Sequence, residues 1–287
     1  MDPVTGLITR YKVPIGAWGA LCVEFLTNHL EKTFDAITAA TRWPLEGSVR
    51  LLLAVPPPLL ILTLAAIAFA LHRSWRLLLL VALGLLYILN QGLWQPMVET
   101  LVLVIYATFV SLIIGMPIGI LCARRPRLYA AITPVLDMMQ TIPTFVYLVP
   151  TLIFFGLGFV PGLVATVIYV VPAPIRLTYL GISRVPKPLI EAGEAFGYTR
   201  RQLLWKVKLP AALPTLMAGV NQTIMLSLSM VVIAALVGAQ GLGALVVRAL
   251  GNVDAQSGIE AGIVIVVVAI ILDRILSRRS AAIEGHQ

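Results

Sequence analysis

EAGEAFGYTRRQLLWKVKLP, residues 191–210, is the longest run between two apolar segments of this chain whose pattern suits contact with another protein in water. Ala192, Ala195 and Phe196 follow the i, i+3, i+4 spacing that places side chains on one face of a helix. Gly197 suits the left-handed conformation that commonly ends a helix. The first half of the run is therefore predicted to be a short helix with one small apolar face.

A second helix is predicted directly after the first. Thr199 and Gln202 form a T-x-x-Q capping box, which satisfies two unpaired N–H groups at the start of a helix. This helix is basic, and we expect it to stop near Pro210. Pro188 can begin the first helix, because the N–H that proline lacks would be unpaired there.

The composition is that of a membrane protein. Of the 287 residues, 59% are hydrophobic and 12% are charged, whereas soluble domains carry about 25% charged residues. The net charge of +8 comes from cations in short loops, which indicates topology signals and contacts with anionic lipid rather than binding to nucleic acid. Cys22, Cys122 and three scattered histidines show no metal-ligand spacing, so neither a disulfide scaffold nor a metal site is expected.

Apolar runs predict an all-α, polytopic fold of about seven transmembrane helices. The predicted spans are 59–71, 77–93, 98–123, 134–155, 162–182, 211–237 and 259–276. Before them, residues 15–44 form an amphipathic pattern that suits a membrane interface and that Pro44 should end. The first 13 residues are expected to be frayed. The predicted units are an interfacial segment (1–56), two accessory spans (57–94), a five-span core (95–276) and a cytoplasmic tail (277–287).

The distribution of Lys and Arg predicts the orientation. Loops 72–76, 123–133 and 183–210, with the end from Arg274, carry most of the cations, and the alternate loops carry only Arg248. Positive loops stay in the cytoplasm, so loop 183–210 and the C-terminus are expected inside. The N-terminal segment then falls outside, although it carries five cations.

Polar residues inside two spans are candidates for a solute path. Met217, Asn221, Met225 and Ser229 form one stripe at i, i+4, i+8 and i+12, with Gln222 and Thr223 beside it. Such a stripe must face protein or water, so it lines a cavity or supplies hydrogen bonds between helices. The alternatives stay open for this stripe, and likewise for Gln140 and Thr141. Prolines 143, 150, 172 and 174 interrupt the fourth and fifth spans, as in many substrate paths.

The chain offers no energy source of its own. Glu99, Asp137, Glu260 and Asp273 all lie at span ends, with Asp137 expected in the first turn of its helix, and Arg176 can reach the cytoplasmic interface. A proton-driven carrier normally buries an acid or histidine in midmembrane. The sequence G-x-x-x-x-G-K-[ST], which binds ATP phosphates, is missing from the chain. A carrier or channel working alone and a membrane enzyme remain the alternative functions.

The pattern E-A-x-x-x-x-G, nine residues, V-x-L-P over 191–210 resembles the cytoplasmic coupling loop of ABC-importer permeases. The family pattern has a third small residue where this chain has Gly193, and Ile where it has Val207. The glycine should weaken the helix by ~1 kcal/mol relative to alanine. The resemblance implies that this helix docks on a separate ATPase. The residues it assigns to that contact are Glu191, Ala192, Gly193, Ala195, Phe196, Gly197, Leu209 and Pro210.

Three further stretches are similar to permeases of glycine betaine, proline betaine and choline importers: LDMMQTIPTFVYLVP (136–150), residues 209–250 around NQTIMLSLSMVVIA, and AIILDRI (269–275). The similarity covers roughly residues 98–276 and implies a type I importer fold in the inner membrane. It also implies a second permease copy, two ATPase subunits that hold ATP-Mg, and an extracytoplasmic binding protein. No cofactor is expected in this chain itself. Another small zwitterion or an amino acid is the alternative substrate.

Overall fold

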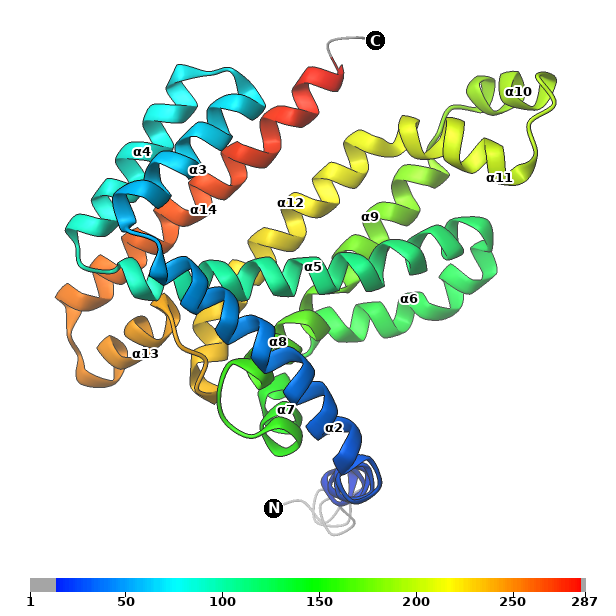
Figure 1. Ribbon diagram of the computed structural model, residues 1–287. Helices are drawn as coiled ribbons and strands as arrows, with labels where there is room; N and C mark the ends of the chain where they lie inside the picture. The colour runs from blue at the N-terminus through cyan, green and yellow to red at the C-terminus, as the bar shows by residue number, and fades with distance from the viewer. Residues whose placement is uncertain (1–13, 285–287) are drawn as a thin grey trace, which may run out of the picture.

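The computed structural model describes residues 14–284, and within that range every regular element is a helix (Figure 1). The all-α prediction is confirmed for these residues, whereas the expected fraying of residues 1–13 lies outside them. The elements are α2 (Ile15–Ala54), α3 (Pro57–His72), α4 (Trp75–Asn90), α5 (Trp94–Arg124), α6 (Pro126–Thr141), η1 (Thr144–Tyr147), α7 (Leu148–Phe155), α8 (Phe159–Val170), α9 (Pro172–Ser183), α10 (Lys187–Ala195), α11 (Arg200–Leu203), the π-helical turn η2 (Leu204–Lys208), α12 (Leu209–Ala234), η3 (Ala235–Val237), α13 (Leu242–Asn252) and α14 (Ala255–Glu284).

The centre of the fold is the packing of α9 between α5 and α12. Glycines let α5 and α9 approach closely: a Cβ atom built on Gly119 would lie 2.6 Å from Thr178 Cβ and 2.7 Å from the Ile175 carbonyl oxygen. Close approach at small residues is how helices associate when lipid removes the hydrophobic drive between them. These three helices pack together as the core that supports α10 and α11.

Four helical segments are long and apolar enough to cross a membrane: 94–124, 159–183, 200–237 and 255–275. The number rises to six if two bent helix pairs each count as one span. The expected number was about seven. Three predicted spans account for the difference: α3 and α4 have only 16 residues each, whereas a straight span needs about 20, and the fourth predicted span is bent.

The predicted fourth span is bent rather than straight. α6 and the helical segment Thr144–Phe155 meet at an angle of 102°. Ile142, which separates them, has φ −63° and ψ 130°, since a residue before proline is pushed out of the α region by the following ring. Pro143 therefore determines where this span breaks. By contrast, α8 and α9 form one 25-residue span across Pro172.

The N-terminal helix α2 continues through Pro44 to Ala54, so the prediction that Pro44 ends it was wrong. A proline inside a helix costs about 3 kcal/mol, and packing on both sides of it offsets that cost. Before the proline, the Phe34 ring stacks on Phe154 of α7 with centroids 4.5 Å apart. After it, Leu45 is only 1% exposed. Tertiary contacts along the helix therefore override the local break.

A second packing unit joins α3 and α4 to α14, which appears red beside the two blue-green helices in Figure 1. Ala68, Val81 and Val264 are fully buried there. At one end the His72 ring nitrogen Nε2 lies 2.5 Å from the Ile275 carbonyl oxygen. α14 extends as helix to Glu284, so the last span runs on into the expected tail.

Candidate coupling end and translocation face

The junction between α10 and α11 has the helix end and the capping box that the sequence predicts. Gly197 adopts φ +75°, the left-handed conformation, and its N–H donates to the Glu194 carbonyl at 2.9 Å. Beyond it, the Gln202 N–H donates to Thr199 Oγ1 at 3.3 Å, and the Thr199 N–H donates to Gln202 Oε1 at 2.8 Å. The predicted capping box is confirmed. The end of α10 and the start of α11 are thus fixed by local hydrogen bonds.

Gly193 is the point at which α10 lies against α11. It is buried, and a Cβ atom at this position would lie 2.7 Å from Leu203 Cδ1 and 3.3 Å from Val207 Cγ2. Glycine at this place lets the two elements touch, which gives a packing reason for a residue with low helix propensity. The remaining coupling candidates on α10, namely Glu191, Ala192 and Ala195, are exposed.

Phe196 protrudes from this end of the molecule. Its side chain is 82% exposed, and Trp205 on the adjoining turn is 59% exposed. Neighbouring Arg200 and Arg201 are exposed too, so this part of the surface is too polar to lie in hydrocarbon. Large exposed apolar side chains with a polar rim mark protein interaction sites. The geometry supports an aromatic knob that another protein covers.

The basic helix was expected to stop near Pro210, but it continues past this residue. Residues 200–237 form one continuous 38-residue helix, in which α11 passes through the π-helical turn η2 into α12. Pro210 has no N–H to donate within the helix, and the π-helical turn η2 ends two residues before it. Leu209 packs partly buried against a core that contains Leu204 and Ala212. α10 thus contacts α11 and η2, which are continuous with α12.

The polar stripe on α12 lies on the open side of that helix. Met217, Asn221 and Met225 are half-buried, and Gln222 and Ser229 are exposed. The hydroxyl of Ser229 donates to the Met225 carbonyl at 3.0 Å. The stripe therefore presents exposed polar side chains, Gln222 and Ser229, to water or to a second protein surface.

Other polar residues of α12, outside the stripe, are buried, and one of them forms a hydrogen bond to α5. Thr223 and Ser227 are fully buried, and the Thr108 hydroxyl of α5 donates to Ser227 Oγ at 3.5 Å. Sequence reasoning missed Ser227. Its i+4 spacing from Thr223 is the signal that could have found it.

Gln140 and Thr141 end α6 and are both exposed. They precede the break at Pro143, and α12 lies against η1 just beyond that break. Thr141 donates to the Met138 carbonyl at 3.2 Å. The structure therefore places this pair at the end of α6, on a separate element from the α12 stripe, and the coupling candidates form a third group on α10 and at the start of α12.

An ion pair connects α6 to α9. Arg176 Nη2 lies 2.6 Å from Asp137 Oδ1. Asp137 was expected in the first turn of its helix, but α6 begins at Pro126, so it lies well inside. Its partner is a guanidinium on another helix rather than a helix dipole, a contact that sequence alone could not show.

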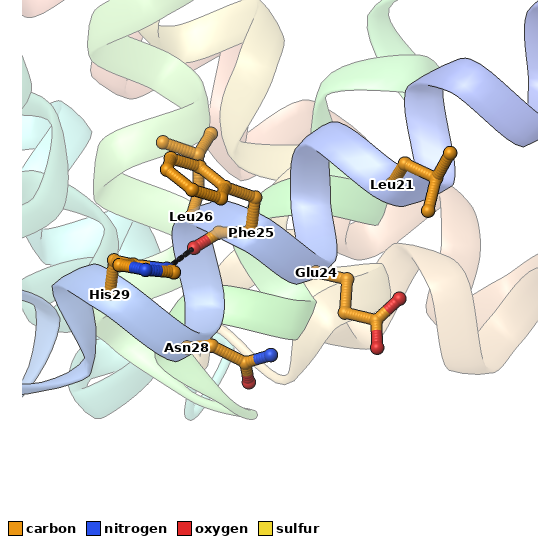
Figure 2. Close-up of a pocket in the computed structure, with 6 residues that line it drawn as sticks. All are labelled: Leu21, Glu24, Phe25, Leu26, Asn28 and His29. Atoms are coloured by element: carbon orange, nitrogen blue, oxygen red, sulfur yellow. Dashed lines mark hydrogen bonds between the residues drawn. The ribbon is translucent and has the colours of Figure 1, made fainter.

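Two hollows involve α2. Among the described residues, the first, of about 690 Å³, is lined by six from α2: Leu21, Glu24, Phe25, Leu26, Asn28 and His29 (Figure 2). A concavity on one helix face offers no convergent groups. The second, of about 360 Å³, lies where α2 meets the loops around Leu157 and Gly238, and it contains charged side chains. Within residues 14–284 no group of three potential ligand side chains could hold a metal ion.

Comparison with known proteins assigns the fold. Residues 115–282 match the family "Binding-protein-dependent transport system inner membrane component". The inward-facing MetNI methionine ABC transporter is similar in structure, with a TM-score of 0.60 and 25% identity over 69% of this chain and 97% of that one. The type I importer fold implied by the similarity over residues 98–276 is thereby confirmed.

Curated relatives are more similar in sequence. The glycine betaine/proline betaine permease ProW of Escherichia coli is 43% identical over 92% of this chain and 74% of its own length. The glycine betaine/carnitine permease GbuB of Listeria monocytogenes is 46% identical, covering 92% and 94%. The glycine betaine permease OpuAB of Bacillus subtilis is 47% identical, covering 88% and 89%. This chain belongs to the family of inner-membrane permease components of binding-protein-dependent ABC transport systems.

Proposed function

We propose that this chain forms the translocation path of an ATP-driven importer for quaternary ammonium osmoprotectants such as glycine betaine, proline betaine or choline. The observation that supports it best is the exposed Phe196 knob at the end of α10, next to the continuous helix 200–237 that contains α12. Such a knob serves a partner, and α12 carries the polar stripe. ATP-Mg is held by the partner ATPase, and this chain binds no cofactor of its own.

The proposed assembly has two permease copies, two ATPase subunits and an extracytoplasmic binding protein. Loop 183–210 and the C-terminus face the cytoplasm, where Glu191, Ala192, Gly193, Ala195, Phe196, Gly197, Leu209 and Pro210 form the contact with the ATPase. The open face of α12 meets the second copy and lines the solute path with Met217, Asn221, Gln222, Met225 and Ser229, joined by Gln140 and Thr141. Segment 1–56 lies in the outer interface, spans 57–94 are accessory to the core 95–276, and 277–287 is the tail.

A quaternary amine is preferred over an amino acid for a specific reason. The relatives at 43–47% identity are named for betaine transport, whereas the methionine transporter is 25% identical. A quaternary ammonium group donates no hydrogen bonds, so it can pass a path that contains no midmembrane acid. Aromatic faces would hold it by cation–π contact, chiefly in the delivering protein.

Reconstitution tests this proposal. Proteoliposomes containing the permease and its ATPase, supplied with ATP inside and binding protein outside, should accumulate labelled glycine betaine or choline but not methionine. Omission of ATP, ATPase or binding protein should abolish uptake. Flux through the permease alone without ATP would support a carrier or channel and contradict the proposal.

A further inference from the structure

The 360 Å³ cavity beside α2 lies at the end of the bundle opposite α10. It is enclosed by α2, by the first turns of α5, and by the loops around Gly158 and Gly238. Ligand sites for small molecules have volumes of about 300–1,000 Å³. The size is therefore sufficient for one small solute, and none of the residues assigned above to coupling or to the solute path lines it.

Glu99 is the unusual group in this cavity. It is only 6% exposed, and its carboxylate accepts one hydrogen bond, from Gln95 Nε2 at 2.9 Å. In the part of the chain that the structure describes, no cation forms an ion pair with it. A buried carboxylate without a counter-charge is unfavourable, so this side chain is set up to receive a cation.

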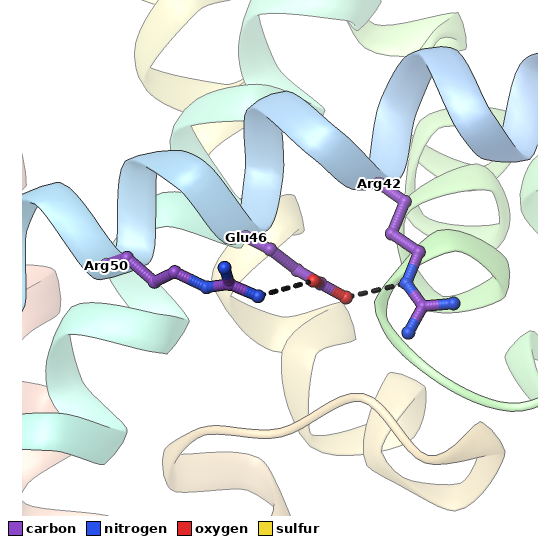
Figure 3. Close-up of polar contacts among 3 residues, drawn as sticks. All are labelled: Arg42, Glu46 and Arg50. Carbon is purple, nitrogen blue, oxygen red and sulfur yellow. Dashed lines mark hydrogen bonds and ion pairs between the residues drawn. The ribbon is translucent and has the colours of Figure 1, made fainter.

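The other charges at the cavity are arranged differently. Glu46 lies between Arg42 and Arg50 on the same face of α2, at 2.7 and 3.4 Å (Figure 3). This acid is already neutralised, and two guanidinium groups stand beside it with side chains 66% and 81% exposed. The cavity thus combines one unpaired anion with a cationic border.

Aromatic side chains complete the wall. Phe155 and Phe159 both line the cavity, and Phe155 is held edge-on against Phe34 of α2, with centroids 5.4 Å apart. An ammonium group without N–H donors is bound by a carboxylate together with aromatic faces rather than by hydrogen bonds. The combination suits a trimethylammonium group, and the arginines suit a carboxylate on the same molecule.

We propose that this cavity is an outer subsite for the quaternary ammonium group of the transported solute, with Glu99 as its counter-ion. This inference rests on the function and orientation proposed above, in which this end faces the outside. A membrane lipid with a choline headgroup presents the same chemistry. The experiment therefore has one arm for free solute and one for lipid.

The solute arm is equilibrium binding of labelled choline and glycine betaine to the delipidated permease–ATPase complex in detergent, without binding protein. Wild type should bind saturably. Glu99→Gln should weaken binding by about thirtyfold or more, the lower range for removing one partner of a buried charge pair, and Glu99→Asp should restore part of it. Glu260→Gln is a matched control, because Glu260 also accepts from a glutamine four residues earlier, Gln256, at 3.0 Å and lies outside this cavity. It should bind as wild type does.

The lipid arm measures phosphatidylcholine retained by the same variants, by native mass spectrometry. Absence of saturable solute binding, equal binding by Glu99→Gln, or Glu99-dependent retention of lipid alone would each overturn the assignment. ATP-driven uptake by the wild-type complex with its binding protein separates the two proposals. If betaine is taken up but does not bind at the cavity, only the proposed outer subsite is refuted. If no quaternary amine is transported, the proposed function is refuted.

Discussion

Truncation of the exposed knob, Phe196→Ala, should leave the permease folded and weaken its binding to the ATPase. Complete burial of a phenylalanine side chain contributes about 1.5–3 kcal/mol. Because Phe196 is 82% exposed in the free chain, most of that amount becomes available only on docking. A loss of about 2 kcal/mol corresponds to a roughly thirtyfold weaker dissociation constant.

The assay is titration of the solubilised permease with fluorescent ATPase, together with thermal unfolding of the permease alone. Phe196→Leu should recover most of the affinity, since it restores much of the apolar area. Leu250→Ala is the matched control: Leu250 is 79% exposed on α13 at the other end of the molecule, and its loss should not change ATPase binding. Wild-type affinity in Phe196→Ala, or a fall in the unfolding temperature of the permease alone, would refute the reasoning.

Three further predictions concern packing and caps. Gly119→Ala should destabilise the permease by about 1–3 kcal/mol, as overpacking does, whereas Gly262→Ala, with nothing within 4 Å, should not; detergent unfolding curves check this, and equal stability would contradict the close packing of α5 and α9. Thr199→Ala should cost about 1 kcal/mol by removing the cap, and hydrogen exchange should speed up at α11 alone; unchanged exchange would count against the capping box. At the start of α14 the Ser257 hydroxyl donates to Asp254 Oδ2 at 2.6 Å and the Ser257 N–H donates to Asp254 Oδ1 at 3.2 Å, and both bonds lower the pKa of Asp254 below its ordinary value. This cap is therefore present at neutral pH and is lost as pH falls through the lowered pKa; protection of the Ser257 N–H relative to its intrinsic exchange rate should fall on acidification, and no such fall should occur in Asp254→Asn.

Local chemistry was readable from the sequence where a few adjacent residues decide the conformation. The turn at Gly197 and the box of Thr199 and Gln202 need no distant partner, and both were predicted and observed. The all-α class could also be predicted, because the apolar runs are long enough to form membrane-spanning helices. The packing role of Gly193 could not be predicted from the sequence, because glycine is needed there to avoid Leu203, which lies on another helix.

Contacts between distant elements explain the remaining differences. Pro44 does not end α2, because aromatic stacking and the buried Leu45 hold the helix on both sides of it. Asp137 is paired with Arg176, 39 residues away. The polar residues of α12 divide between an open face and a buried face only once the position of α5 is known. Periodicity shows that a polar stripe exists but not which helix it faces.

The central claim is that the helix end at residue 196 meets an ATPase while the opposite end meets the delivering protein. The most direct measurement is photo-crosslinking of the assembled complex in membranes, with p-benzoyl-phenylalanine placed at position 196 or at position 250. Position 196 should form a covalent adduct with the ATPase, and position 250 should not. An adduct between position 196 and the binding protein, or capture of the ATPase at position 250, would contradict the account.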